Sequence, residues 1–171
     1  WLMEPNIEKC KVMSIGSNKD IGSERSYSIR RKDGVAVTLS HTEEERDLGI
    51  VLTPDFKFSA QASRAASKAN AILGMLRHTF LSRDVETWAS LYRTYIRPHL
   101  EFANSAWRPF LRRDIVALEK VQRRVTRLPK SLKGLDYNAR LERMGLTTLE
   151  TRQKRGDLIQ MFKITRGADI V

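Results

Sequence analysis

Apolar residues recur at helical spacing over the C-terminal two-thirds of the chain. From Ser59 onward an apolar side chain falls in almost every turn, and the basic residues Arg64 and Lys68 fall on the opposite side. The buried stripe expected for this first helix comprises Ala62, Ala66, Ala69, Leu73, Leu76 and Phe80. The pattern therefore predicts a helix with one buried side and one side facing solvent.

A second helix is predicted from about Arg83. Its inward side is expected to contain Val85, Trp88, Leu91, Tyr92 and Tyr95. Pro98 should bend or end this helix, because proline has no backbone N–H to donate. The helical pattern continues to Trp107, and Pro109 interrupts it again.

The third helix contains the stretch LEKVQRRVTRLPK, residues 118–130, in which apolar and basic residues alternate in blocks. Its apolar side is expected to comprise Ile115, Leu118, Val121, Val125 and Leu128. Arg113, Lys120, Arg124 and Arg127 follow one another at intervals of seven, four and three residues, so they share another side of the helix. Pro129 is expected to end it.

Two shorter patterns complete the helical part. A helix from Tyr137 to Met144 is predicted to end at Gly145, since glycine commonly follows the last residue of a helix. The motif TTLE predicts that Thr147 caps the last helix and that Glu150 bonds back to it. This helix should run to about Thr165 with Leu158, Ile159 and Phe162 inward and with Arg152, Lys154 and Arg155 near its start.

The first third of the chain has the pattern of short strands instead. A strand is expected between Cys10 and Gly16, a hairpin around Lys32-Asp33-Gly34, and a further apolar run from Leu48 to Leu52. Pro54 lies near the change of period. We therefore predict a mainly α, α+β fold with two parts: residues 1–55, a short β-hairpin lead-in, and residues 56–171, a helical bundle.

Charge is distributed unevenly between these two parts. The chain has 31 Lys and Arg, 20 Asp and Glu, and a net charge of +11. Residues 1–55 contain 8 basic and 10 acidic residues, whereas residues 56–171 contain 23 and 10, a net of +13. Such asymmetry favours a polyanionic partner, above all a nucleic acid. A membrane surface and a basic surface without a specific partner are the alternatives.

The sequence contains no pattern typical of an intrinsic catalytic or metal site. His41, His78 and His99 lack metal-ligand spacing, Cys10 is the single cysteine, and no glycine-rich phosphate loop is present. The acidic cluster from Glu43 to Asp47 is typical of a solvated turn. No transmembrane stretch or signal peptide occurs, and a lone cysteine fits a reducing compartment.

Several stretches together resemble reverse transcriptases of LINE-type, non-LTR retrotransposons. They are WLMEPNIEKCKVMSIG, in which Asn6 and Lys9 form an N-x-x-K pattern, and EEERDLGIVLTPD, with its Leu48-Gly49 pair. The most specific arrangement is IRPHLEF followed by W-x-P at Trp107 and by LEKVQRR. Further matches are ANAILGMLRHTF and LERMGLTTLETRQKRGDLIQMFKI, so the resemblance covers nearly the whole chain.

The resemblance implies that the chain is the end of a polymerase palm followed by a helical thumb. The family's catalytic aspartates, fingers and Mg²⁺ site would precede Trp1, so no catalytic residue is expected here beyond an auxiliary role for Lys9 with the departing pyrophosphate. Leu48 and Gly49 would form the tip of the primer grip. The expected partners are an RNA/DNA template–primer and the missing palm and fingers, with no membrane, in the nucleus and cytoplasm. The candidate nucleic-acid-binding residues are Arg64, Lys68, Arg113, Lys120, Arg123, Arg124, Arg127, Arg152, Lys154 and Arg155.

Two other functions fit the same sequence. The chain could be a domesticated, free-standing nucleic-acid-binding protein without a polymerase role. It could instead be a protein-interaction module that uses an aromatic belt comprising Trp88, Tyr92, Tyr95, Phe102 and Trp107. The helical spacing of these aromatic residues is equally typical of core packing.

Overall fold

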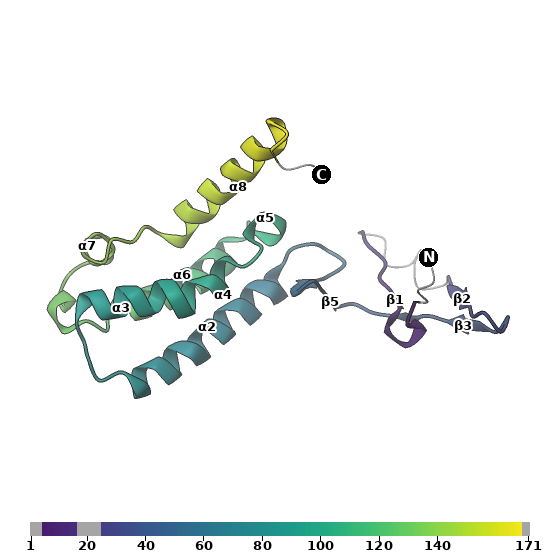
Figure 1. Ribbon diagram of the computed structural model, residues 1–171, viewed down its shortest axis with the longest axis horizontal. Coiled ribbons are helices and arrows are strands. Elements are labelled where there is room, and N and C mark those ends of the chain that lie inside the picture. Colours follow the sequence, from purple (N-terminus) through teal and green to yellow (C-terminus); the bar gives the residue numbers. More distant parts are fainter. Residues whose placement is uncertain (1–4, 17–24, 169–171) are drawn as a thin grey trace. The chain divides into compact units, whose positions relative to one another are not determined.

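The computed structural model describes residues 5–16 and 25–168, and the chain divides into two compact units, Trp1–Lys57 and Phe58–Val171. The fold is α+β and mainly α: short strands form the first unit and helices form the second (Figure 1). This is the fold class that the sequence pattern predicts. The expected change from strands to helices after residue 55 lies two residues before the division.

The first unit consists of short strand pairs among its described residues. After a single 3₁₀ turn, η1 (Ile7–Lys9), strand β1 (Lys11–Val12) pairs in parallel with β4 (Ser40–His41). Two antiparallel pairs accompany it: β2 (Ser28–Arg30) with β3 (Ala36–Thr38), and β5 (Glu45–Asp47) with β6 (Ile50–Leu52).

Both antiparallel pairs turn at the predicted residues. Gly34 closes the β2–β3 turn with φ +85°, and the Arg31 N–H donates to the Val35 carbonyl across it at 2.8 Å. Leu48 and Gly49 form the β5–β6 turn with φ +45° and +89°, which is the two-residue geometry that suits the twist of a hairpin. The Leu48 side chain is 88% exposed at this tip.

The second unit begins with the 21-residue helix α2 (Ser59–Thr79). A nearly continuous helical run follows, comprising α3 (Val85–Leu91), the π-helical segment η2 (Tyr92–Ile96) and α4 (Arg97–Glu101). After α5 (Asn104–Trp107) come α6 (Arg112–Val125), the 3₁₀ turn η3 (Lys130–Leu132), α7 (Tyr137–Arg143) and α8 (Leu149–Thr165).

Helices α2 and α6 run parallel and pack against each other. Two hydrogen bonds fix their register: Arg113 donates to the Ser59 hydroxyl at 3.2 Å, and Arg124 donates to the Asn70 side-chain oxygen at 2.7 Å. The partners of both hydrogen bonds are 54 residues apart in sequence, so the two helices run in the same direction. The predicted stripe of α2 is buried from Ala62 to Leu76, as are the large side chains Trp88, Tyr92, Trp107, Leu118, Val121 and Val125.

The π-helical segment moves one predicted core residue to the surface. The Arg97 N–H donates to the Tyr92 carbonyl five residues back, so this turn holds an extra residue. Burial therefore falls on Tyr92, Ile96 and Leu100 at intervals of four, and Tyr95 is 50% exposed. The expectation that Tyr95 faces inward is wrong. The wide turn directly precedes Pro98, which has no N–H and could not continue an ordinary helical ladder.

The start of α8 differs by one residue from the predicted cap. Thr148, not Thr147, caps the helix: its hydroxyl accepts from the Thr151 N–H at 3.2 Å. Glu150 does not bond back but pairs with Lys154 at 2.9 Å. Gly145 ends α7 as predicted, with φ +59°. Two adjacent threonines offer equivalent caps, so the sequence alone does not fix the register.

The distal half of α8 has no core beneath it. Leu158, Ile159 and Phe162 are 71%, 47% and 61% exposed, so the prediction that they face inward is wrong. Leu149 and Gln153, in the first turns, are buried against the bundle. Beyond them the helix extends past the other helices of its unit (Figure 1).

A buried polar network joins α6 to α7 and to the start of α8. The Tyr92 hydroxyl donates to the Gln122 side-chain oxygen. The Gln122 amide donates to the Tyr137 hydroxyl at 3.0 Å and to the Thr147 carbonyl at 2.9 Å. Tyr137 donates in turn to the Glu119 carboxylate, which also accepts from the Leu149 N–H at 3.0 Å. These bonds fix α7 and α8 against the outer edge of α6.

Candidate nucleic-acid interface

The exposed side of α6 contains a dense group of cations. We call Arg112, Arg113, Lys120, Arg123 and Arg124 the α6 basic face. All five are exposed, and at 100° per residue they lie within about one third of the helix circumference. Both carboxylates of the helix, Asp114 and Glu119, are buried. The exposed side of α6 is therefore charged with one sign only.

Two members of this face are held in place by hydrogen bonds to side chains of α2. Arg113 and Arg124 donate to the Ser59 hydroxyl and to the Asn70 side-chain oxygen of α2, both of which are neutral. Arg113 also forms an ion pair with Asp114, whose carboxylate lies 3.7 Å from the Arg113 Nε, is buried and accepts from the Ser59 hydroxyl at 2.6 Å. Oriented guanidinium groups on a rigid helix lose little entropy when they bind an anion.

A cavity of about 310 Å³ adjoins the face between α6, α7 and the start of α8. Its lining includes Arg112, Lys120, Arg123, Tyr137, Asn138 and Glu150. The Arg123 guanidinium lies over the Tyr137 ring, 4.5 Å from its centre. Burial, and then the hydrogen bond to Glu119, raise the pKa of the Tyr137 hydroxyl, so it stays a neutral donor at all ordinary pH values.

Lys120 and Arg127 are the cations best placed to bind an external anion. Both are exposed, and neither forms an ion pair with a carboxylate in the part of the chain that the structure describes. Arg127 lies just past the end of α6 rather than on it, because the helix ends at Val125. The predicted alignment of Arg113, Lys120 and Arg124 holds on the helix.

The three basic residues at the start of α8 have different environments. Arg152 makes a two-pronged ion pair with Glu101, from its Nε at 2.5 Å and its Nη2 at 3.1 Å. That hydrogen bond raises the pKa of Arg152, whose charge is neutralised within the fold. Lys154 pairs with Glu150, which also accepts from Arg112 at 3.3 Å. Arg155 is exposed.

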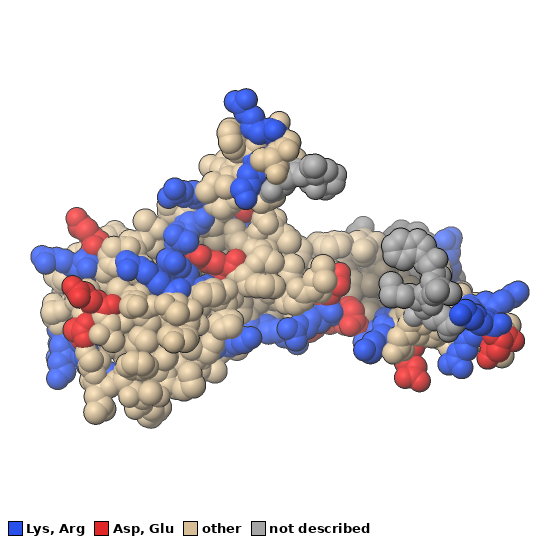
Figure 2. Space-filling model, in the orientation of Figure 1, with Lys and Arg blue, Asp and Glu red and all other residues tan. Residues whose placement is uncertain are grey.

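Arg64 and Lys68 lie on a different surface from the α6 basic face. They are one turn apart on the exposed side of α2. Burial, followed by the charge of Lys68, lowers the pKa of His99 on α4, so Lys68 lies beside α4. Ser59 and Asn70 contact α6 from the other edge of α2. The predicted basic residues of α2 and α6 thus divide between two surfaces. Figure 2 shows that Lys and Arg side chains are spread over much of the visible face of the molecule.

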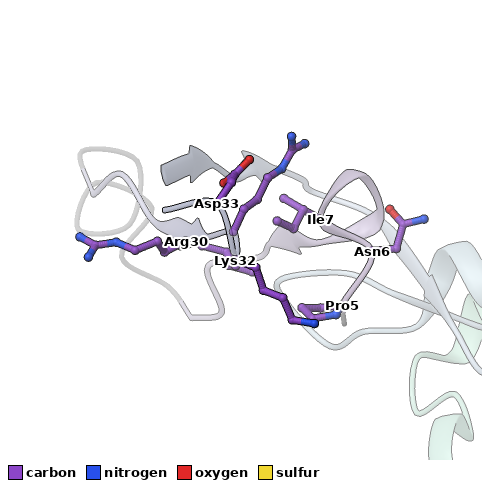
Figure 3. Close-up of a pocket in the computed structure, with 8 residues that line it drawn as sticks. Pro5, Asn6, Ile7, Arg30, Lys32 and Asp33 are labelled. Carbon is purple, nitrogen blue, oxygen red and sulfur yellow. The ribbon is translucent and has the colours of Figure 1, made fainter. Parts of the chain in front are cut away.

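The candidates of the first unit lie at exposed turns. Leu48 and Gly49 are at the hairpin tip, and Lys9 is exposed at the end of η1, whose first residue is capped by Asn6. A cavity of about 630 Å³ in this unit is lined by residues 5–7 and 29–33. Figure 3 shows Lys32 extending toward Pro5 across it. Lys9 is not among the residues that line this cavity.

Three residues of the interface were missed by the sequence reasoning. Arg112 precedes Lys120 by eight residues, a spacing that places both on one side of α6 and could have been noticed. Tyr137 and Asn138 reach the same place from α7. Nothing in the sequence indicates that contact, because it depends on how α7 packs.

Within residues 5–16 and 25–168, no three His, Cys, Asp or Glu side chains are grouped so that they could hold a metal ion. None of the described helices combines the length and the apolar character needed to cross a membrane. No family model, curated protein or solved structure matches the chain.

Proposed function

We propose that this chain is a nucleic-acid-binding part of a retrotransposon RNA-directed DNA polymerase and that it holds the template–primer duplex by its backbone. The observation that carries the proposal is the α6 basic face, on which five exposed cations lie together while both carboxylates of the helix are buried. The net charge of +13 on residues 56–171 supports it.

The dimensions of the face suit a duplex backbone. From Arg112 to Arg124 the helix rises by roughly 18 Å, which corresponds to about five base pairs of duplex. Guanidinium and ammonium groups on this face would contact phosphate oxygens and would not read base edges. Binding would therefore depend on salt and hardly on sequence, as a polymerase thumb requires.

The resemblance supplies the rest of the proposed assembly. A palm and fingers with paired aspartates and Mg²⁺ would complete the active site, with Leu48 and Gly49 at the primer end and Lys9 near the pyrophosphate. The chain would then act in the nucleus and cytoplasm. Its own contribution would be to hold the duplex through the cations of the α6 basic face.

The test is a fluorescence titration of a labelled RNA–DNA hybrid at several salt concentrations. The triple variant Lys120→Gln, Arg124→Gln and Arg127→Gln should weaken binding and reduce the slope of log K against log salt by about two to three. The matched control replaces Arg77, Arg143 and Arg166, three exposed cations elsewhere in the unit, with Gln, so the net charge changes equally.

The control triple should change the slope by less than about one, since its charges lie away from the proposed contact. Glutamine preserves helix propensity, and circular dichroism should confirm that both variants are folded. Equal slopes for the wild type and the first triple variant would refute the proposal.

A protein-interaction role is the second candidate, and the distal half of α8 favours it. Leu158, Met161 and Phe162 are each at least 60% exposed on consecutive turns. Exposed apolar groups of this size commonly mark protein contacts. The aromatic belt does not support this role as a whole, because Trp88, Tyr92 and Trp107 are buried. A protein partner whose affinity is the same at low and at high salt would favour this function.

A further inference from the structure

A stripe of apolar rings lies exposed along η2 and α4. Tyr95 and Phe102 are 50% and 52% exposed, and Pro98 between them is exposed as well. His99 is half-buried beside them. We call these four residues the ring stripe: Tyr95 lies in η2, Pro98 and His99 lie in α4, and Phe102 directly follows α4. Ile96 and Leu100 of the same run are buried.

Cations border the ring stripe on the α2 side. Lys68 is close enough to His99 for its charge to lower the pKa of that imidazole, after the larger effect of burial. Arg64 precedes Lys68 by one helical turn on the same exposed side of α2. The neutral imidazole of His99 adds a flat, uncharged ring at neutral pH. The surface therefore combines flat apolar groups with a basic edge.

The ring stripe is separate from the α6 basic face. The opposite flank of α4 is occupied by Glu101, which pairs with Arg152 of α8. Helix α2 intervenes on the other flank, because its Ser59 and Asn70 contact α6 while its Lys68 approaches α4. A ligand on the ring stripe would thus bind apart from a duplex on α6.

We propose that the ring stripe binds single-stranded nucleic acid, with bases stacked on Tyr95 and Phe102 and the phosphates along Lys68 and Arg64. Single strands expose the faces of their bases, whereas a duplex buries them within its own stack. Exposed aromatic rings beside cations are the arrangement that proteins use for this purpose. Tyr95 and Phe102 lie about two helical turns, or roughly 10 Å, apart, a distance that a few nucleotides span.

This inference rests on the proposed function in one respect, that the chain binds nucleic acid. It adds a second ligand class on a second surface. In a polymerase the single strand would be the unpaired part of the template. The charge complementarity of Lys68 and Arg64 favours such a strand over an apolar protein segment, which would gain nothing from the basic edge.

The test compares a fluorescein-labelled single strand of about 20 uridines with an RNA–DNA hybrid of equal length. The double variant Tyr95→Ala with Phe102→Ala removes both rings, and Tyr95→Phe with Phe102→Tyr keeps them. Phe162→Ala is the control for loss of an exposed ring, since Phe162 is 61% exposed on α8. Both rings of the stripe are half-exposed, and the Phe102 carbonyl that accepts from Trp107 is retained in every variant.

The alanine pair should weaken single-strand binding about 10-fold or more, while hybrid binding changes less than about 2-fold. The conservative pair and Phe162→Ala should bind the single strand as the wild type does. Lys68→Gln should reduce the salt slope for the single strand by roughly 0.7.

Unchanged single-strand affinity in the folded alanine pair would overturn the inference, and so would an equal loss for the hybrid. Failure of the proposed function is a different result: the α6 triple variant would then keep its salt slope for the hybrid. Ring-dependent binding of the single strand by a chain that binds no hybrid would support the ring stripe and refute the duplex proposal.

Discussion

Replacing Tyr137 with Phe should destabilise the helical unit through the loss of two identifiable hydrogen bonds. The Tyr137 hydroxyl donates to the Glu119 carboxylate, which is 9% exposed, and accepts from the Gln122 amide at 3.0 Å. Gln122 would keep its bond to the Thr147 carbonyl at 2.9 Å, and Glu119 would keep the Leu149 N–H at 3.0 Å. The variant therefore loses two bonds, the one to the Glu119 carboxylate and the one from the Gln122 amide, and leaves the other bonds of the network in place.

A bond to a charged carboxylate contributes about 1.5–3 kcal/mol, and the second bond is lost as well, so the free energy of unfolding should fall by at least about 1.5 kcal/mol. The Tyr137 ring remains, and with it the contact with Arg123. Urea unfolding followed by circular dichroism measures the change. Tyr95→Phe is the matched control: because Tyr95 is exposed, this change should lower the free energy of unfolding by less than about 0.5 kcal/mol. Equal stability of the two variants would refute the reasoning that this network holds α7 and α8 on α6.

Four further outcomes are expected. Leu118→Ala should lower the free energy of unfolding by about 2–5 kcal/mol in the same urea assay, because Leu118 is 1% exposed. Leu158→Lys with Phe162→Lys should change it by less than about 1 kcal/mol, since both side chains are exposed; a larger loss would mean that they are core residues after all. The pKa of Asp84 is lowered to about 2, first by the Ser82 hydroxyl and then by the Thr87 N–H. The charged carboxylate therefore stabilises the fold above about pH 4, and this stabilisation is lost as the pH falls through 2. Asp84→Asn should remove this pH dependence when unfolding is measured at acid pH. Primer extension by the purified chain with Mg²⁺ and all nucleotides should return only the starting primer, and template-dependent extension would contradict the fragment interpretation.

The helices and hairpin turns could be predicted because local rules decide them. The stripe of α2 and the apolar side of α6 follow the helical period, and burial confirms both from Ala62 to Leu76 and at Leu118, Val121 and Val125. Asp33-Gly34 and Leu48-Gly49 form turns because glycine adopts positive φ without strain. In each case the residues that determine the structure are neighbours in sequence.

Errors arose where the backbone departs from its average period or where no partner covers a helix. The extra residue in η2 rotates Tyr95 out of the core, and periodicity with 3.6 residues per turn cannot represent that. Leu158 and Phe162 have the spacing of a buried stripe, yet the fold provides nothing to bury them. Spacing shows which residues share a side, but only packing shows whether that side is covered.

In the candidate site, the sequence likewise shows which residues are basic, but only the structure shows which of them are paired with a carboxylate. The helical spacing of the sequence predicts that Arg113, Lys120 and Arg124 lie together. Arg152 is predicted to bind nucleic acid as well, because it is basic and lies near the start of the last helix. The structure separates them, because Arg152 is neutralised by Glu101 through two contacts whereas Arg124 is held by a neutral amide. A cation that is held but not neutralised can bind a phosphate at little cost, and a cation already paired must first give up its carboxylate. Lys120 and Arg124, which form no ion pair with a described carboxylate, are therefore better suited than Arg152 to hold a duplex, although their charge is the same.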